Sequence, residues 1–345
     1  MFRRLDPFLT CLLAAVALAT VVPCPARWQP ALAHLTSALI MLMFFFQGAK
    51  LKRSALVESL KDWQLQGAVL AVTFVVFPLV GLGLYAFCHR FAPHLLAPAL
   101  WTGILFLCCL PSTVQSSIAL TSIARGNVPA AICAATASNI LGIFLTPLLT
   151  GLLLGPAVSG TGHGGTSALS TILAVARELL VPFIAGQCVQ RWVGPVVARH
   201  KFLLSLTDRG SIIVMVYAAF SSAVLQGLWH RIPPLDFLTV TGVCFVLLVI
   251  LLLLTVLLAR LLGDDRADTI VLQFCGSKKS LATGVPMASV IFPAGAGIIV
   301  VPLMIYHQLQ LFICTLLARH YARTFAESQA GAEPSRFQGT GTPST

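Results

Sequence analysis

The sequence predicts an all-α membrane protein of ten transmembrane helices, arranged as two inverted five-helix repeats. Three observations predict this class: an apolar composition, an uneven placement of basic residues between successive linkers, and matched interruptions in two apolar segments. Of the 345 residues, 57% are hydrophobic and only 10% are charged, against about 25% charged in an ordinary soluble domain. A chain of this composition is expected to lie in a lipid bilayer.

Ten apolar segments are long enough to cross a membrane, since a spanning helix needs about 20 mostly apolar residues. They cover residues 7–26, 31–49, 66–88, 97–123, 127–155, 170–190, 209–228, 236–262, 267–292 and 296–318. The linkers are short, so residues 1–325 are expected to form a single transmembrane unit, with one repeat in 1–156 and the other in 167–325. Residues 326–345 are rich in Ser, Thr, Gly and Pro, which predicts a disordered C-terminal tail.

The basic residues test this layout. The chain holds 22 Lys and Arg against 11 Asp and Glu. With the N-terminus in the cytoplasm, the inner segments hold 16 of the basic residues and the outer segments three, as the positive-inside rule requires. Both termini are therefore expected in the cytoplasm, in a plasma membrane or a bacterial inner membrane. The first segment, after Arg3 and Arg4, also resembles a secretory signal. We retain it as a membrane span, because the topology of ten spans is complete only with it.

Two of the ten segments are interrupted by polar residues. The fourth is interrupted at residues 110–117 and the ninth at residues 275–280. The ten segments divide into two halves of five, and the fourth and ninth hold the same place in each half. Because each half has an odd number of spans, the two halves have opposite orientations in the membrane. Paired breaks of this kind indicate an inverted-repeat transporter whose broken helices 4 and 9 cross at the binding site.

Hydroxyl and amide side chains cluster at both interruptions. At mid-membrane such groups can cap the ends of half-helices or supply oxygens to an ion, although Ser and Thr also serve simple packing between membrane helices. Because both clusters sit at breaks, we favour function. The candidates are Ser112, Thr113, Gln115, Ser116 and Ser117 in the fourth segment and Ser277 and Ser280 in the ninth.

Lys278 and Lys279 are the most specific feature of the chain. Burying an unpaired ammonium in a bilayer costs about 3 kcal/mol or far more, and no acidic residue in the same segment offers a partner. A lysine here could neutralise the carbonyl-rich ends of the half-helices. It could equally bind an anionic substrate or release a proton, as buried lysines can. Both readings are compatible, and we expect Lys279 to face the crossing.

Thr73, Asn139 and Gln273 are further buried candidates for substrate or ion binding, and each could instead form a hydrogen bond between helices. No Cys/His metal spacing, nucleophile elbow, HExxH, phosphate-binding loop or dinucleotide fingerprint is present. The sequence therefore predicts no enzyme, no resident metal and no cofactor. Basic runs interleaved with aromatics are also lacking, which argues against nucleic-acid binding.

At these residues the sequence resembles the bile acid:sodium symporter family, and specifically its SBF-like branch. The resemblance covers about residues 5–325, and the stretches that carry it are Phe44–Leu51, Leu110–Ser112, Ala124–Asn127 and Phe274–Leu281. It implies ten helices in two inverted repeats, with broken helices four and nine crossing in a core domain beside a panel domain. This layout agrees with the one obtained above from the apolar segments.

The resemblance also implies candidate positions for sodium. The family's Ser-Asn pair in helix four corresponds to Ser116 and Ser117, and its helix-nine Glu to Gln273. The helix-three Gln corresponds to Thr73, and the Gln in the ninth break to Ser277. A sodium site at Ser116, Ser117 and Gln273 would thus lack the family's carboxylate. We therefore hypothesise that an ammonium, that of Lys279, occupies the place of a sodium ion, with coupling to protons or no coupling ion.

The sequence favours a secondary transporter of a small organic anion that works by alternating access. The buried lysines, the positive ends of the half-helices and the family resemblance support an anionic solute. Sodium coupling is an expectation from the resemblance alone. The alternative is a non-transporting membrane protein that senses a ligand or regulates ion homeostasis.

Overall fold

The computed structural model describes residues 7–50, 63–159, 168–199, 201–225, 227, 234–293 and 295–331. Within these residues all regular structure is helical. The elements are α1 (Pro7–Val21), η1 (Ala26–Trp28), α2 (Gln29–Lys50), α4 (Trp63–Ala71), η2 (Val72–Val76), α5 (Phe77–Phe91), α6 (Pro98–Cys109), α7 (Val114–Ile123), α8 (Val128–Ser159), α9 (Ala168–Cys188), α10 (Gln190–Arg199), α11 (Lys201–Leu225), α12 (Pro234–Leu262), α13 (Arg266–Gly276), α14 (Leu281–Ile291) and α15 (Ala296–Gly331). The arginines at positions 3 and 4 and residues 332–345 of the expected tail lie outside the described residues.

The helices confirm a multi-pass membrane protein. Six of those described are long and apolar enough to cross a membrane. A seventh is added when α6 and α7, which meet at an angle of 63°, are taken as one broken span. The expected number of ten and the inverted symmetry of the two halves remain predictions.

The boundaries of several elements differ from the sequence prediction. The break in the fourth segment is shorter than expected, because α7 begins at Val114 and makes Ser116 and Ser117 helical. The ninth segment stays helical to Gly276, so its break is limited to residues 277–280. At the C-terminal end α15 continues to Gly331, six residues into the expected tail. Between the sixth and seventh segments an additional helix, α10, has formed.

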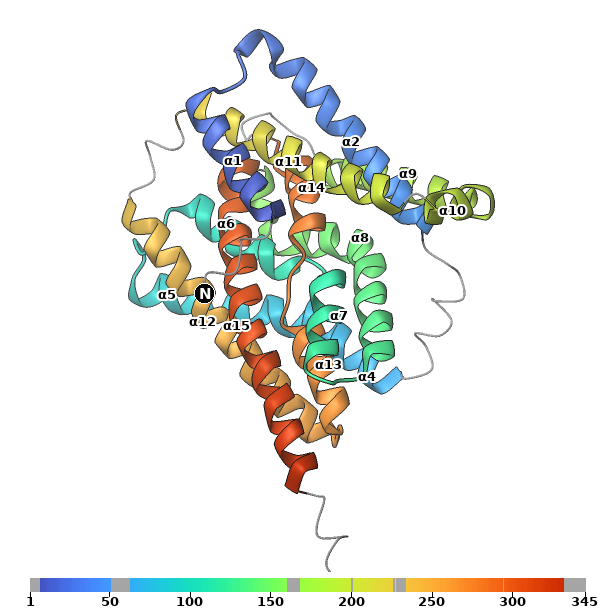
Figure 1. Ribbon diagram of the computed structural model, residues 1–345. Helices are drawn as coiled ribbons and strands as arrows, with labels where there is room; N and C mark the ends of the chain where they lie inside the picture. Colours follow the sequence, from blue (N-terminus) through green and yellow to red (C-terminus); the bar gives the residue numbers. More distant parts are fainter. Residues whose placement is uncertain are drawn as a thin grey trace, which may run out of the picture.

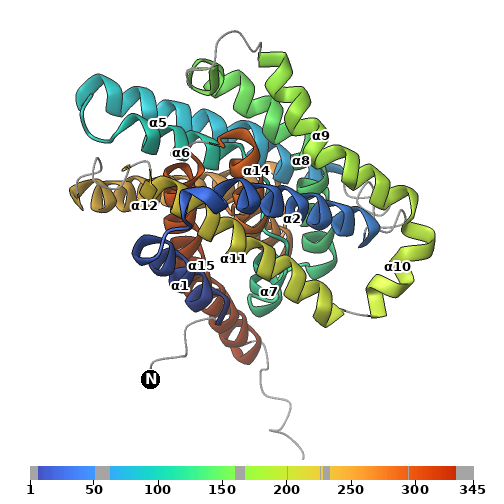
Figure 2. The same ribbon diagram turned by 90° about the horizontal axis from the view of Figure 1, so that it is seen from above.

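The helices form two groups (Figures 1 and 2). Helices α1, α2, α9 and α11 pack on one another, and α2 and α11 cross the top of the view in Figure 1. The other group contains α4 to α8 and α12 to α15, with α15 packed along α6 and α12. Contacts of α8 and α14 with α9, and of α14 and α15 with α11, join the two groups.

Two glycines let α2 and α9 approach to backbone contact. A Cβ atom at Gly48 would lie 2.1 Å from the carbonyl oxygen of Phe183, and one at Gly186 would lie 2.1 Å from that of Phe45. The side chain of Gln187 donates a 2.6 Å hydrogen bond to the Gly48 carbonyl at the same crossing. Small residues at such positions are typical of closely packed membrane helices.

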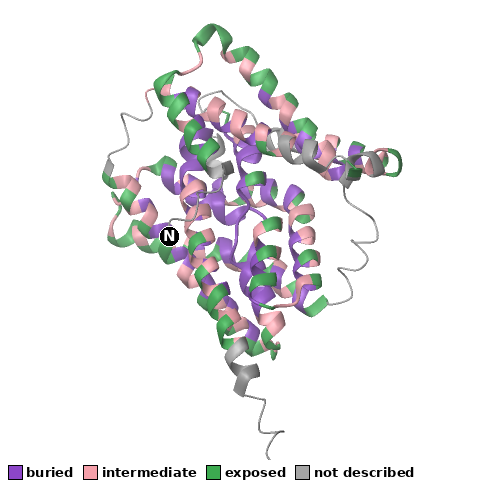
Figure 3. Ribbon diagram, viewed as in Figure 1, coloured by how far each residue is buried: buried purple, intermediate pink, exposed green. Residues whose placement is uncertain are grey.

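Buried residues concentrate where the two interrupted segments pass through the second group (Figure 3). Both lysines, 278 and 279, are fully buried there, together with Ser112, Ser117 and Ser277. Large apolar side chains such as Leu79, Leu152 and Leu253 are instead more than 60% exposed. This distribution, apolar outside and polar at the centre, suits a protein surrounded by lipid.

Candidate functional site

The two interrupted segments touch each other directly. The backbone amide of Ser280, in the α13–α14 break, donates a 2.9 Å hydrogen bond to the carbonyl of Pro111, in the α6–α7 break. Non-helical backbone inside a membrane needs such partners, since lipid offers none. The crossing of the two breaks is therefore the polar centre of the molecule.

Every carbonyl from Cys108 to Ser112, at the end of α6, has a donor from another element. Pro111 ends the helix because it has no N–H and restricts the residue before it. Lys279 Nζ donates to Cys108 and Leu110, Thr146 Oγ1 to Cys109, the Ser280 amide to Pro111, and Asn139 Nδ2 to Ser112. This complete pairing explains how a helix end can be buried at this depth.

Lys279 supplies the charge at this helix end. Its ammonium donates to the carbonyls of Thr73, Cys108 and Leu110 at 2.8, 2.8 and 2.7 Å. Nζ also lies 4.0 Å from the centre of the Phe77 ring, a favourable cation–π position. An ammonium has three N–H donors. Here two carbonyls at the negative end of α6 and one from η2 accept them. The Lys279 ammonium is thus fully hydrogen-bonded within the crossing.

The carbonyl of Thr73 is available because of a local π-helical turn. In η2 the amide of Phe77 donates to the carbonyl five residues earlier, that of Val72. The next donor in this pattern would be residue 78, which would serve Thr73. Residue 78 is proline and has no N–H. From the sequence, Pro78 in a regular α-helix would free the carbonyl of residue 74. Only the π-helical turn makes the free carbonyl that of Thr73, and such turns are rare and often mark functional sites.

Lys278 is buried to the same degree but is paired less completely. Among the described residues its ammonium has one hydrogen-bond acceptor, the carbonyl of Ser116 in the first turn of α7, at 3.0 Å. Nζ also lies 5.3 Å from the centre of the Phe274 ring. Since the N-terminal end of α7 carries partial positive charge, an anion would be stabilised here by both the helix and the ammonium.

The hydroxyl groups at the start of α7 bond to one another and to α13. Thr113 Oγ1 lies 2.7 Å from Ser116 Oγ and 3.2 Å from Ser117 Oγ, and makes no capping bond to the α7 backbone. Ser117 donates to the Phe274 carbonyl at 3.0 Å. Gln115 is exposed and has no contact in this cluster. Of these hydroxyl residues Ser116 is half-buried, whereas Thr113 and Ser117 are buried.

The second break is held by hydroxyls of its own and by α15. Ser280 caps α14 by accepting from the Thr283 amide, and Ser277 donates to the Gln273 carbonyl at 2.6 Å. Tyr306 donates to the Ser277 carbonyl at 2.7 Å. Gln310 forms two 2.9 Å hydrogen bonds with the backbone of Lys279.

Asn139 of α8 joins both breaks. Its amide nitrogen donates to the Ser112 carbonyl at 2.7 Å, and its oxygen accepts from the Thr283 hydroxyl at 3.1 Å. The Ser112 amide, in turn, donates to Ser138 of the same helix at 3.0 Å. Sequence reasoning identified Asn139 but missed Ser138 and Thr283, since isolated hydroxyl residues in apolar helices carry no distinctive pattern.

Gln273 and the side chain of Thr73 do not point into the crossing. The Gln273 amide donates to the Leu252 carbonyl at 3.3 Å, and its oxygen accepts from Tyr321 at 2.8 Å, which turns it toward α12 and α15. The Thr73 hydroxyl donates within its own helix, to the Val69 carbonyl. The expected sodium ligands Ser116, Ser117 and Gln273 are therefore engaged with different elements.

These observations define a multi-pass helical membrane protein with a charged, hydrogen-bonded crossing of interrupted helices at its centre. The chain matches the SBF-like CPA transporter family over residues 6–323. It belongs to that family, which is a family of membrane transporters. The resemblance inferred from the sequence is confirmed.

Several curated proteins are similar along most of their length. An uncharacterized protein of Pseudomonas aeruginosa is 52% identical over 319 residues, which cover 92% of this chain and 93% of that protein. The protein named Putative symporter YfeH, of Escherichia coli, is 44% identical over 336 residues, 97% of this chain and 98% of its own. Sodium/bile acid cotransporter 7 of Xenopus tropicalis is 29% identical over 293 residues, 82% of this chain and 81% of its own.

Proposed function

We propose that this chain is a secondary transporter of a small organic anion and works by alternating access. The observation that carries the proposal is the pair of fully buried lysine side chains at the crossing of two interrupted helices. A cation at this depth is costly, and Lys278 has a single hydrogen-bond acceptor among the described residues, which favours a function in binding. The relatives named as a symporter and as a sodium/bile acid cotransporter support transport of a solute.

The proposed architecture has ten spans with both termini in the cytoplasm. The seven candidate spans, together with α1, α9 and the α13–α14 pair, make up this number. Residues 1–156 and 167–325 are the proposed inverted repeats. Helices α1, α2, α9 and α11 would then act as the panel against which the other group moves.

Within the site the two lysines have different roles. Lys279 takes the place of a coupling cation, because three carbonyls accept hydrogen bonds from its ammonium. Lys278, with one such acceptor, receives the anion when the core opens toward solvent. The remaining candidates at the crossing are assigned to the walls of this site: Ser112, Thr113, Ser116, Ser117, Asn139, Ser277 and Ser280. Thr73 and Gln273 lie behind these walls, and Gln115, exposed on α7, lies outside them.

The proposed coupling follows from the same geometry. The sodium positions of the family would need oxygens that here are occupied by Lys279 or turned toward other helices. Transport is accordingly coupled to protons, or proceeds without a coupling ion. A sodium ion at Ser116, Ser117 and Gln273 is the alternative that the family resemblance implies.

Uptake into proteoliposomes tests the proposal. Purified protein is first screened for thermal stabilisation by dicarboxylates, organic sulfonates and steroid carboxylates, because a ligand stabilises the state it binds. The stabilising anion is then followed into vesicles with an imposed sodium or pH gradient. We expect uptake without sodium that is lost in Lys278→Ala. It should be retained in Ser289→Ala, a control that removes a hydroxyl whose hydrogen bond stays within α14.

The outcomes separate the alternatives. Stabilisation by an anion without flux would favour a sensor or regulator over a transporter. Uptake that depends on sodium alone, and that Lys279→Ala leaves undiminished, would overturn the assignment of Lys279 as a substitute for the coupling ion.

A further inference from the structure

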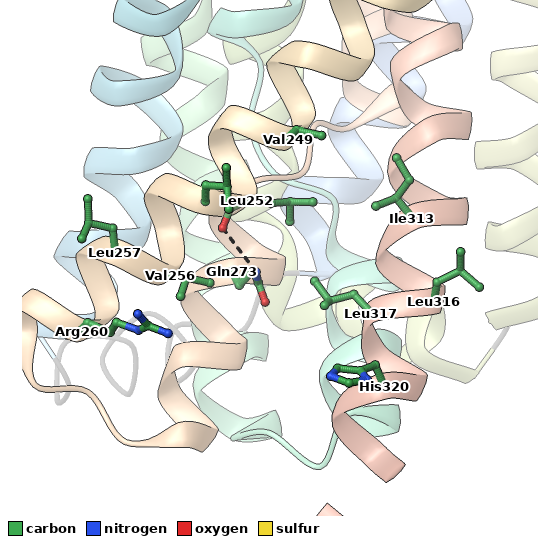
Figure 4. Close-up of a pocket in the computed structure, with 11 residues that line it drawn as sticks. Val249, Leu252, Val256, Leu257, Arg260, Gln273, Ile313, Leu316, Leu317 and His320 are labelled. Atoms are coloured by element: carbon green, nitrogen blue, oxygen red, sulfur yellow. Dashed lines mark hydrogen bonds between the residues drawn. The ribbon is translucent and has the colours of Figure 1, made fainter. Parts of the chain in front are cut away.

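A groove of about 650 Å³ runs between α12 and α15 on the outer side of the second helix group. Figure 4 shows its two walls and, between them, Gln273 of α13. The walls are aliphatic side chains, and several of them are open to the surroundings, with Leu253 66% and Leu316 53% exposed. Its polar groups come from Gln273 on the floor and from Arg260 and His320 at one end (Figure 4).

The length of the groove matches one leaflet of a bilayer. On α12 it extends from Val249 to Arg260, a rise of about 16 Å at 1.5 Å per residue. Half of the hydrocarbon core of a membrane is about 15 Å thick. An extended acyl chain therefore fits along the groove with its headgroup at the end that carries Arg260 and His320.

The charge of that end favours an anion. Arg260 lies in the last turn of α12, and its side chain has no ion pair or hydrogen bond with any described residue. The exposed ring of His320 lies opposite on α15. Basic pockets between membrane helices at the cytoplasmic face commonly hold anionic lipid headgroups, and the proposed topology places Arg260 on that face.

We infer that this groove binds an anionic phospholipid, with an acyl chain between α12 and α15 and a phosphate against Arg260 and His320. The lipid packs over Gln273, whose hydrogen bonds to Leu252 and Tyr321 join α13 to both walls. Occupancy therefore stabilises the packing of the three helices beside the second break. This role is separate from transport of the solute.

Native mass spectrometry of the full chain in mild detergent tests the inference. Phosphatidylglycerol and phosphatidylcholine with identical acyl chains are titrated against the wild type and three variants. Arg260→Gln removes the proposed phosphate contact, and Leu257→Trp fills the groove without a change of charge. Arg319→Gln is the matched control. Arg319, on α15, is exposed like Arg260, but it does not line the groove.

We expect tighter retention of phosphatidylglycerol than of phosphatidylcholine by the wild type. Arg260→Gln should weaken binding of phosphatidylglycerol about fivefold, Leu257→Trp should weaken binding of both lipids, and Arg319→Gln should leave binding unchanged. Equal retention of the two lipids by the wild type, or equal weakening by Arg260→Gln and Arg319→Gln, would overturn the inference.

Discussion

The amide of Ser280 and the carbonyl of Pro111 form a backbone hydrogen bond of 2.9 Å between the two interrupted segments. Neither group could be satisfied within its own helix, since each lies in a break. Each break thus supplies a partner that the other lacks. The two segments are expected to move as one body when the transporter changes state.

Asn139 is predicted to hold this body together. Asn139→Leu removes the bonds to the Ser112 carbonyl and the Thr283 hydroxyl, and it leaves the Ser112 carbonyl without this donor while the Thr283 hydroxyl keeps its bond to Ser280. We expect a loss of about 1–3 kcal/mol of stability, measured by thermal unfolding in detergent. Thr102→Val is the control, because the exposed Thr102 hydroxyl bonds only within its own helix. An equal effect of the two substitutions would contradict the bridging role of Asn139.

The α2–α9 crossing is predicted to tolerate no side chain at its two glycines. In Gly48→Ala or Gly186→Ala the new methyl group would meet a backbone carbonyl oxygen at 2.1 Å, so the helices must separate. Overpacking of this kind costs about 1–3 kcal/mol, and the melting temperature should fall. Gly242→Ala, where no atom lies within 4 Å, should have no effect or a small stabilising one. A comparable fall in Gly242→Ala would mean that the loss does not come from the close approach of α2 and α9.

The sequence predicted the position of the crossing well, because backbone-breaking residues and charges mark it. Pro111 cannot continue α6, and the adjacent lysines have no tolerable place in an apolar helix except beside free carbonyls. The extent of the breaks was predicted less well. Val114 to Ser117 are helical because the hydroxyls of this segment bond to one another and to α13, which releases the backbone to form α7.

Which way a buried side chain points could not be predicted, since it depends on helices distant in sequence. Gln273 turns to α12 and α15 because Tyr321, 48 residues later, donates to its oxygen. The roles of Lys278 and Lys279 likewise follow from carbonyls 162 to 206 residues away along the chain. Both lysines bond to the other interrupted segment, so the expectation that Lys279 rather than Lys278 faces the crossing stays a prediction. The availability of the Thr73 carbonyl depends on a π-helical turn that the sequence did not predict.

The two lysines are predicted to differ in their contribution to stability. Lys279→Met leaves three buried carbonyls without a donor, whereas Lys278→Met leaves one. A buried acceptor left without its donor typically costs about 1–3 kcal/mol, and we expect a loss of at least this size for Lys279→Met, with its three carbonyls, and a smaller loss for Lys278→Met. Thermal unfolding of both variants in the same detergent measures the difference. A larger loss in Lys278→Met would mean that the carbonyl contacts of Lys279 are not its main stabilising interaction.

Lys279→Ala is predicted to create a response to sodium that the wild type lacks. Removal of the ammonium leaves the carbonyls of Thr73, Cys108 and Leu110 directed at an emptied position next to the Phe77 ring. Rings of backbone carbonyls coordinate alkali cations in membrane proteins. A sodium ion that binds there should raise the melting temperature. At a sodium concentration ten times the dissociation constant, the free energy of unfolding should increase by about 1.4 kcal/mol.

The measurement compares sodium chloride with choline chloride at equal ionic strength, for Lys279→Ala, Lys278→Ala and the wild type. Sodium should stabilise the first variant and neither of the others, because Lys278→Ala leaves the ammonium of Lys279 in place. An equal response of all three proteins would mean that sodium binds elsewhere. A response of the wild type alone would show that the Lys279 ammonium supports a sodium site rather than replacing one.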